Sequence, residues 1–376
     1  MHSKPSVSTR SLARVVAEDL RRKMVFVAGP RQVGKTTLAR GLPDLGDGYR
    51  NWDIPEHRSQ LLAGEMPGSL LWALDEVHKF RRWRNWLKGL WDGRRPAQQI
   101  LVTGSARLDQ FRRGGDSLQG RYHLLRLHPL SCAELGMTSQ DELLLLDRLG
   151  GFPEPFLSGS ERHARRWSRE YRTRLLREEV VDQEQISDLG AMELLMGRLP
   201  ELVGSLLSVN ALREDLQVAH RTLARWLDVL DRFYAIFRLA PFGSPRIRAI
   251  KKAQKHYHWD WSVVPEAPAR FENMIASHLL KWVHWQQDVE GHDYELRYFR
   301  DTDGREVDFV VVDRRRPILL VECKLGDDAA DKSLRYLHEK FPAAPAWQVS
   351  LHGKKDYVTT EGIRVAPALT LLSALV

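Results

Sequence analysis

The stretch GPRQVGKTT, from Gly29 to Thr37, constrains the fold of this 376-residue chain more than any other. It has the pattern G-x-x-x-x-G-K-T, follows the apolar run KMVFVA and precedes the helical pattern TLARGL. A strand that enters a glycine-rich turn and leaves it as a helix is the context in which this pattern binds phosphate. The glycines let backbone N–H groups surround phosphate oxygens, and the helix N-terminus adds partial positive charge. The sequence therefore predicts a nucleotide-binding loop between a strand and a helix.

Each residue of this loop has a predicted place in the nucleotide site. Lys35 is expected to reach the β- and γ-phosphates, and Thr36 to offer its hydroxyl to Mg²⁺. The other residues are expected to enclose the phosphates: Gly29, Pro30, Arg31, Gln32, Val33, Gly34 and Thr37.

An acidic pair follows the next apolar strand pattern, in SLLWALDEVHK. We expect this strand to bring Asp75 to the Mg²⁺ shell, and the next residue, Glu76, to polarise the attacking water as a general base. The alternative is a strand that simply ends in solvated acids. The upstream loop favours the catalytic interpretation.

Two further positions are candidates for contact with the γ-phosphate. The strand pattern QQILVTGS ends at Thr103 and Ser105, and either hydroxyl could sense the γ-phosphate beside Glu76. Arg121, in LQGR, is a catalytic candidate that would reach a γ-phosphate in cis or from a neighbouring subunit. A surface salt bridge is an equal alternative for Arg121.

Five stretches in this order resemble a prokaryotic branch of the AAA+ ATPases: GPRQVGKTTLAR, LDEVHK, VTGS, LQGR and HPLSCAEL. The resemblance is strong over residues 8–135 and extends to GGFPEPF at 150–156, similar to a motif that opens the helical lid of these proteins. It implies ATP as the nucleotide, with Mg²⁺, and a doubly wound sheet of strand order 5-1-4-3-2. Relatives of this kind often form rings, so a homo-oligomer is expected. No Asn-Lys-x-Asp motif for guanine occurs, and the Asp-Glu pair favours hydrolysis over the chemistry of a nucleotide kinase.

Residues 136–190 are predicted to form a helical lid with a strongly basic helix. Its arginines indicate either a solvated face with glutamate partners or a strip that follows phosphates. They are Arg162, Arg165, Arg166, Arg169, Arg172 and Arg174.

Residues 191–262 are predicted to form a winged-helix-like segment and a linker, because three short helical patterns precede the strand pattern YAIFRLAPF. Such a segment reads DNA, contacts a protein or covers an ATPase, and all three uses remain open. Residues 244–262 are either a nucleic-acid contact or a linking strand with exposed Lys and Arg. The third helix is expected to expose His220, Arg221, Thr222 and Arg225, and to bury Leu223, Trp226, Leu227 and Leu230.

Residues 263–376 carry a second carboxylate pattern. YELRYFRDTDGREVDFVVVDRRRPILLVECKLG predicts three strands joined by two turns. Because side chains alternate along a strand, Glu322 and Lys324 share one face, while Asp308 lies in the preceding strand. Asp308 and Glu322 are predicted to hold Mg²⁺, and Lys324 to orient or deprotonate a water. Glu272 could complete the shell from the preceding helix.

This pattern resembles the PD-(D/E)xK nuclease superfamily over roughly residues 265–350. The resemblance implies an α/β nuclease-like domain that acts on DNA, although members of the superfamily can lose catalysis and keep the fold. The motif is short and lacks a proline before Asp308. A hairpin with two ordinary salt bridges is the alternative.

Composition narrows the class of protein. The 57 Lys and Arg residues against 49 Asp and Glu give a formal net charge of +8, which is compatible with nucleic acid or an anionic surface. Two cysteines, Cys132 and Cys323, without a secretory leader predict a reduced, cytoplasmic protein. The sequence has no run of eighteen apolar residues, so no membrane contact is expected.

Together these patterns predict an α/β protein that hydrolyses ATP on a P-loop parallel sheet of the AAA+ type in residues 1–135. Turnover is expected to move or remodel a DNA-bound C-terminal half. Two alternatives remain open: a nucleotide-gated switch that recruits a protein partner, and an ATP-coupled, Mg²⁺-dependent DNA nuclease.

Overall fold

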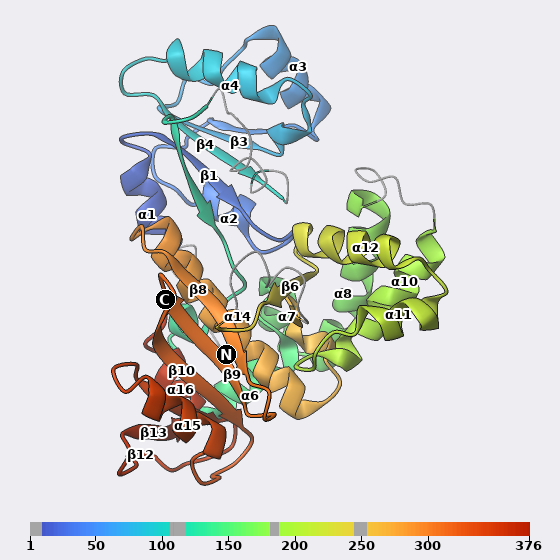
Figure 1. Cartoon of the computed structure of the whole chain (residues 1–376). Coiled ribbons are helices and arrows are strands. Elements are labelled where there is room, and N and C mark those ends of the chain that lie inside the picture. The colour runs from blue at the N-terminus through green and yellow to red at the C-terminus, as the bar shows by residue number, and fades with distance from the viewer. Residues whose placement is uncertain (1–9, 106–107, 109–117, 181–187, 244–253) are drawn as a thin grey trace. The chain divides into compact units, whose positions relative to one another are not determined.

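A computed structural model describes residues 10–105, 108, 118–180, 188–243 and 254–376, apart from the side chains of residues 178 and 179. The chain divides into two compact units between Leu130 and Ser131. Figure 1 shows the sheet of the first unit in blue to green and the large sheet of the second unit in orange to red.

The first unit is built on a parallel sheet of five strands in the order β2-β3-β4-β1-β5. The strands are β1 (Met24–Ala28), β2 (Tyr49–Asn51), β3 (Leu71–Asp75), β4 (Gln99–Gly104) and β5 (Tyr122–Arg126). The helices are α1 (Leu12–Asp19), α2 (Lys35–Arg40), α3 (Pro55–Ala63) and α4 (Trp83–Asp92), with the 3-10 turn η2 (Val77–Lys79) after β3. The predicted strand order, 5-1-4-3-2, is confirmed, since it is the same order counted from the other edge.

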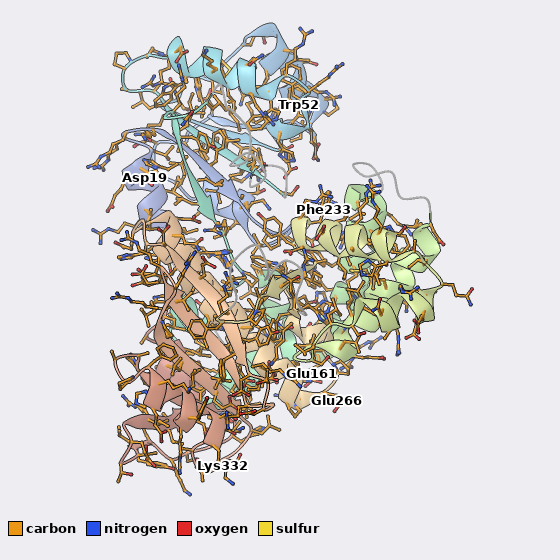
Figure 2. The ribbon with its side chains drawn as sticks, viewed as in Figure 1. Asp19, Trp52, Glu161, Phe233, Glu266 and Lys332 are labelled. Atoms are coloured by element: carbon orange, nitrogen blue, oxygen red, sulfur yellow. The ribbon has the colours of Figure 1, made fainter. Side chains whose placement is uncertain are left out.

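The central strands of this sheet are buried and largely apolar, with polar side chains such as Asp75 near their C-terminal ends. Every residue of β1 and β3 is buried, as expected for parallel strands that are covered on both faces. Aromatic rings fill the core beside them. Phe26 stacks on Tyr122 with ring centroids 4.4 Å apart, and Trp52, labelled in Figure 2, stacks on Phe80 at 5.0 Å. This packing fixes the ends of β1 and β3, from which the predicted site residues follow.

The second unit begins with helices around a buried aromatic cluster. They are α5 (Cys132–Leu135), α6 (Gln140–Leu149), α7 (Pro153–Ser158), α8 (Glu161–Arg174) and the π-helical turn η4 (Leu175–Val180). Phe152, in the stretch GGFPEPF, is fully buried, and its ring lies 5.0 Å from Trp167 and 5.2 Å from Tyr171, both on α8. One face of α8 is therefore aromatic and buried, while its arginine-rich face is exposed.

A helical segment and a small antiparallel sheet follow. The elements are α10 (Leu189–Arg198), the 3-10 turn η5 (Leu199–Leu202), α11 (Val209–Leu216), α12 (His220–Arg232), β6 (Ile236–Leu239) and β7 (Lys255–His258), with β6 paired to β7. The predicted core side of α12 is confirmed, because Leu223, Trp226, Leu227 and Leu230 are buried. His220, Arg221 and Arg225 are exposed and Thr222 is half-buried. The winged-helix assignment itself stays a prediction.

A mixed sheet of six strands, in the order β12-β13-β11-β10-β9-β8, forms the C-terminal part of the second unit. Its strands are β8 (Tyr294–Arg300), β9 (Glu306–Asp313), β10 (Arg316–Lys324), β11 (Ala346–Ser350), β12 (Tyr357–Val358) and β13 (Ile363–Pro367). The accompanying helices are the 3-10 turn η6 (Trp261–Val263), α14 (Ala267–Asp288), α15 (Lys332–Lys340) and α16 (Ala368–Leu372). The three strands and two turns predicted for residues 294–326 are confirmed, whereas the nuclease-like fold stays a prediction. In the described part of the chain, no helix combines the length and apolar character needed to span a bilayer.

Candidate functional site

The predicted phosphate loop lies between β1 and α2. A Cβ atom at Gly29 would lie 2.3 Å from the carbonyl oxygen of Leu127, so only glycine fits there. Gly34 has a φ of 105°, a left-handed conformation that glycine adopts without strain. Lys35 is buried, and its Nζ donates to the carbonyl oxygens of Gly29 and Pro30 at 2.9 and 2.6 Å. The lysine ammonium is therefore held against the loop that is predicted to enclose the phosphates.

Asp75, at the end of β3, accepts hydrogen bonds from three hydroxyl groups. Its Oδ2 accepts from Thr36 Oγ1 at 2.7 Å and from the Tyr49 hydroxyl at 2.8 Å, and its Oδ1 accepts from Thr103 Oγ1 at 2.6 Å. Thr36 lies in the first turn of α2, Tyr49 lies on β2, and Thr103 lies opposite Asp75 on β4. A carboxylate and a threonine hydroxyl in contact are oxygen ligands of the kind that Mg²⁺ prefers. Thr36 and Asp75 therefore fit the predicted metal ion.

Glu76 adopts a left-handed conformation directly after β3, with a φ of 58°. Its backbone N–H donates to the carbonyl oxygen of Thr103 at 2.9 Å, which fixes this turn to β4. Its carboxylate lies 3.5 Å from Lys79 Nζ and 3.6 Å from His78 Nε2. Burial raises the pKa of Glu76, while the positive charges of Lys35 and Lys79 oppose the rise. A raised pKa helps a carboxylate to accept a proton from water, as a general base must.

Arg121 lies at the opposite end of the sheet from the phosphate loop. Its guanidinium donates to the Asp92 carboxylate, with Nε 3.0 Å and Nη2 3.3 Å from the oxygens. Its carbonyl oxygen accepts from the N–H of Met24, the first residue of β1. The phosphate loop follows Ala28, the last residue of the same strand. Five strand residues at about 3.3 Å each separate these ends by roughly 16 Å. The structure thus contradicts the predicted contact in cis and has the surface ion pair instead, while a contact in trans stays a prediction.

Tyr49 and His78 are site residues that the sequence patterns do not reveal. Burial raises the pKa of the Tyr49 phenol, and the negative charge of Asp75 raises it further. The phenol therefore stays protonated and donates to the Asp75 carboxylate. The guanidinium of Arg40 lies 4.3 Å over the Tyr49 ring. His78 is buried, and a Cβ atom at Gly104 would lie 2.4 Å from its Nδ1. Gly104, the glycine in VTGS, is the one local sequence signal that a side chain packs closely against the end of β4.

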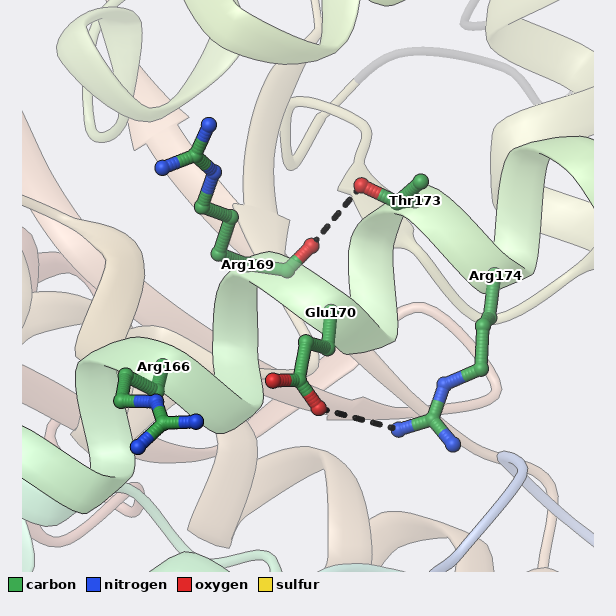
Figure 3. A pocket seen from close by; sticks show the side chains of 5 residues that line it. All are labelled: Arg166, Arg169, Glu170, Thr173 and Arg174. Carbon is green, nitrogen blue, oxygen red and sulfur yellow. Dashed lines mark hydrogen bonds and ion pairs between the residues drawn. The ribbon is translucent and has the colours of Figure 1, made fainter.

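The exposed face of α8 lines a surface hollow of about 540 Å³. Figure 3 shows its lining, which comprises Arg166, Arg169, Glu170, Thr173 and Arg174. Arg174 reaches Glu170 only at 4.0 Å, and Thr173 donates to the carbonyl oxygen of Arg169 at 3.1 Å. Within the described ranges, Arg166 and Arg169 form no ion pair. The hollow therefore presents positive charge that an anion could neutralise.

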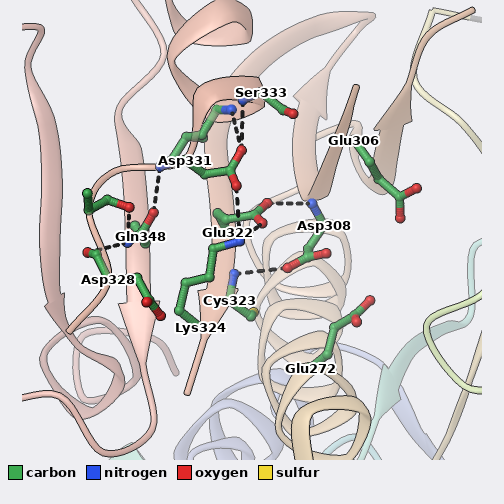
Figure 4. A network of polar contacts seen from close by, with 12 residues as sticks. Glu272, Glu306, Asp308, Glu322, Cys323, Lys324, Asp328, Asp331, Ser333 and Gln348 are labelled. Atoms are coloured by element: carbon green, nitrogen blue, oxygen red, sulfur yellow. Dashed lines mark hydrogen bonds and ion pairs between the residues drawn. The ribbon is translucent and has the colours of Figure 1, made fainter. Parts of the chain in front are cut away.

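The residues predicted for a second site also come together from α14, β9 and β10, and Asp331 at the start of α15 joins them (Figure 4). The Asp308 N–H donates to Glu322 Oε2 at 3.3 Å, and the Cys323 N–H donates to Asp308 Oδ2 at 2.9 Å. Lys324 Nζ donates to Glu322 Oε1 at 2.8 Å and to Asp331 Oδ2 at 3.0 Å. Both predicted acids therefore bind groups of the protein itself.

Lys255 of β7 completes this cluster, and its position corrects one prediction. Its side chain is 1% exposed, so the interpretation of residues 244–262 as a strand with exposed Lys and Arg is wrong at this position; residues 244–253 lie outside the described part. Lys255 Nζ lies 2.5 Å from Glu306, 3.1 Å from Glu272 and 3.7 Å from Asp308. An ammonium group thus lies among carboxylates where a metal ion was predicted.

The predicted Mg²⁺ ligation by Asp308 and Glu322 does not fit this arrangement. All four carboxylate oxygens of the two residues face a backbone N–H or a lysine ammonium. Among the residues that the structure describes, no group of three or more His, Cys, Asp or Glu is arranged to hold a metal ion. Burial raises the pKa of Asp308 well above its ordinary value, and the charges of Glu272 and Glu322 add to the rise.

Family comparisons agree with this division of the chain. Residues 21–136 match the family described as AAA domain. The first unit is therefore similar to an AAA domain over most of its length. Residues 142–272 and 269–371 match two families described as domains of unknown function, DUF8612 and DUF4143. The match supports the AAA+ resemblance of the sequence, whereas the nuclease resemblance stays a prediction.

Two similar proteins and two solved structures extend the comparison beyond the first unit. Two uncharacterized proteins, from Mycobacterium bovis and Mycobacterium tuberculosis, are each 28% identical over 317 residues, which is 77% of this chain and 70% of each relative. A Walker-type ATPase of Pyrococcus abyssi shares 15% identity, with a TM-score of 0.45 over 69% of this chain and 94% of that one. A STAND ATPase with a tetratricopeptide-repeat sensor from Pyrococcus horikoshii shares 14% identity, with a TM-score of 0.22 over 74% of this chain and 47% of that one. Both scores are too low to establish a common overall fold.

Proposed function

We propose that the AAA domain binds ATP with Mg²⁺ and hydrolyses it. The observation that carries the proposal is the Asp75 carboxylate, which Thr36, Tyr49 and Thr103 hold by hydroxyl hydrogen bonds directly beside the phosphate loop. In this proposal Thr36 and Asp75 hold Mg²⁺, which when bound offsets the charge of the phosphates. Thr103 positions Asp75, a role that differs from the direct contact with the γ-phosphate predicted from the sequence.

Glu76 acts as the general base in this proposal. Its carboxylate accepts a proton from water while the water oxygen bonds to the γ-phosphorus. The bond between the γ-phosphorus and the β–γ bridging oxygen breaks, which gives ADP and inorganic phosphate. Lys35 exchanges the carbonyl oxygens of Gly29 and Pro30 for phosphate oxygens, and its charge stabilises the transition state.

Phosphate release by the purified full chain tests this function. Lys35→Ala is expected to abolish ATP binding, because the buried ammonium is lost. Glu76→Gln is expected to retain ATP and to lose turnover, since an amide cannot accept the proton. Glu56→Gln is the matched control, as Glu56 is an exposed acid on α3. Equal turnover in the Glu76 and Glu56 variants would refute the assignment of the base.

We further propose that turnover is coupled to DNA bound by the second unit. Three features support DNA as the partner: the hollow on α8 with Arg166 and Arg169, the exposed Arg221 and Arg225 on α12, and the net charge of +8. Positive groups of this kind bind the phosphate backbone and make affinity depend on salt. The measurement is ATP turnover with single- and double-stranded DNA at two salt concentrations. DNA is expected to stimulate turnover, and salt to reduce this stimulation. An ATP turnover rate that DNA does not change at low salt would contradict the coupling.

A further inference from the structure

Lys255 is the feature of the second unit that the proposed function leaves unexplained. Its side chain is 1% exposed, and burying a lone ammonium ion in a protein interior costs several kcal/mol. Three carboxylates from two elements compensate this cost: Glu272 of α14, and Glu306 and Asp308 of β9. Figure 4 shows these three acids around the ends of β9 and β10. The lysine is thus the positive centre of an otherwise acidic cluster.

The backbone around Lys255 is fixed, so its ammonium group stays in the cluster. The buried amide of Asn273, on α14, binds both backbone groups of His258: its Oδ1 accepts from the N–H at 2.7 Å, and its Nδ2 donates to the carbonyl oxygen at 2.8 Å. The Tyr257 hydroxyl donates to Glu272 at 2.7 Å. These bonds attach Tyr257 and His258 of β7 to two adjacent residues of α14, Glu272 and Asn273.

We propose that Lys255 is the resident cation of this cluster, and that the C-terminal domain of the protein folds and works without a bound divalent metal ion. The charge of Lys255 replaces the charge that a metal ion would bring to Glu272 and Asp308, and Lys324 supplies positive charge to Glu322. The neighbouring bonds support this reading, because Asp308 and Glu322 also accept from backbone N–H groups of the facing strand. Cleavage of DNA that depends on Mg²⁺ at these acids is therefore not the output of the domain.

The same charges predict what removal of the lysine does. Lys255 and Lys324 are two ammonium groups among five carboxylates, namely those of Glu272, Glu306, Asp308, Glu322 and Asp331. Without the charge of Lys255, these acids, of which Glu322 is buried and the others are half-buried, lie close together with less positive charge to neutralise them. Hard divalent cations bind such oxygen groups. Lys255→Met is therefore expected to create a divalent-cation site that the natural chain lacks.

Thermal unfolding of the nucleotide-free full chain, in EDTA and in millimolar Mn²⁺, tests the proposal. The Tm of the natural chain is expected to be the same in both. Lys255→Met is expected to unfold several degrees lower in EDTA and to regain much of that loss in Mn²⁺, with a saturable dependence on concentration. A foldable Lys255→Met variant that does not respond to Mn²⁺ would overturn the proposal.

Lys281→Met is the matched control. Lys281 is a second buried lysine of the same unit, and it pairs at 2.5 Å with Glu134, outside the cluster of five carboxylates. Its loss is expected to lower the Tm without rescue by Mn²⁺, because it leaves Lys255 in place among those carboxylates. Rescue of this variant as well would overturn the assignment of the new cation site to the cluster.

A comparison of the natural chain with Asp308→Asn decides the question even if Lys255→Met does not fold. Mn²⁺ titration by calorimetry is expected to give the same isotherm for both, since Asp308 holds no metal ion in the natural chain. A saturable Mn²⁺ site that is present in the natural chain and lost in Asp308→Asn would refute the proposal.

Discussion

The Thr36 hydroxyl donates to Asp75 Oδ2 over 2.7 Å, although 39 positions separate the two residues in the sequence. This contact joins the phosphate loop to the end of the neighbouring strand, β3. Since Oδ2 also accepts from the Tyr49 hydroxyl and Oδ1 from Thr103, the carboxylate has little freedom to rotate. A metal ligand that is fixed in this way binds its ion with less loss of entropy.

Tyr49→Phe is expected to raise the Mg²⁺ concentration that turnover requires. The change removes one of two hydroxyl donors to Asp75 Oδ2 and leaves the ring, with Arg40 over it, in place. Loss of a group that orients a metal ligand typically costs about 10- to 100-fold in metal affinity or activity. The measurement is the Mg²⁺ concentration that gives half-maximal phosphate release. Tyr357→Phe, at an exposed tyrosine, is the control, and equal values for the two variants would contradict this role.

Gly104→Ala is expected to damage the site through His78. The added Cβ would lie 2.4 Å from Nδ1 and 2.8 Å from Cε1 of the buried imidazole, which must move and disturb Glu76 beside it. Overpacking of this kind costs about 1–3 kcal/mol of stability. The Tm of thermal unfolding and the rate of phosphate release should both fall.

Gly89→Ala is the matched control for this change. Gly89 lies within α4, and a Cβ there meets nothing within 4 Å. Alanine in a helix is favoured over glycine by about 1 kcal/mol, so this variant is expected to be slightly more stable and fully active. Similar losses in the two variants would mean that the space around His78 has no special importance.

Buried histidines are expected to make the protein sensitive to acid. Burial lowers the pKa of His278 to about 4, from an ordinary value of 6.5. Its Nε2 lies 3.2 Å from the N–H of Cys132 and Nδ1 lies 2.8 Å from the carbonyl oxygen of Met274, so one ring nitrogen must act as an acceptor. Between these pH values the unfolded chain binds a proton that the folded chain does not. The free energy of unfolding is therefore expected to be lost as the pH falls from 6.5 toward 4, by at most about 3 kcal/mol for this residue.

Urea unfolding at a series of pH values measures this effect. His278→Gln is expected to be less stable at neutral pH and to depend less on pH in this window than the natural chain. His163→Gln, at an exposed position of α8, is the control and should keep the natural profile. Parallel profiles for the natural chain and the His278 variant would exclude His278 as a source of the acid sensitivity.

Arg166→Gln combined with Arg169→Gln is expected to reduce the salt dependence of DNA binding. Each phosphate contact contributes about 0.9 to the slope of log affinity against log salt on duplex DNA, so the slope should fall by up to about 2. Arg198→Gln is the control, because Arg198 is exposed but already pairs with Glu201 and Asp215. An unchanged slope in the double variant would mean that the hollow on α8 does not contact phosphate.

The sequence by itself determined the parts of this protein that depend on local geometry. The glycines of the phosphate loop, the acids that end β3 and the alternation of Glu322 and Lys324 follow from residue type and spacing along single elements. The strand order 5-1-4-3-2 was implied by the resemblance of the motif stretches to AAA+ ATPases, and the sheet has this order.

Only the tertiary structure decided which distant groups neutralise one another. From the sequence alone, the polar groups of Tyr49, Arg121 and Lys255 could each face solvent or bind a partner inside the protein. Folding placed Tyr49 on Asp75, Arg121 on Asp92 and Lys255 among the C-terminal acids. Charge pairing depends on distances and burial that arise between elements, and no period or spacing within one element encodes them.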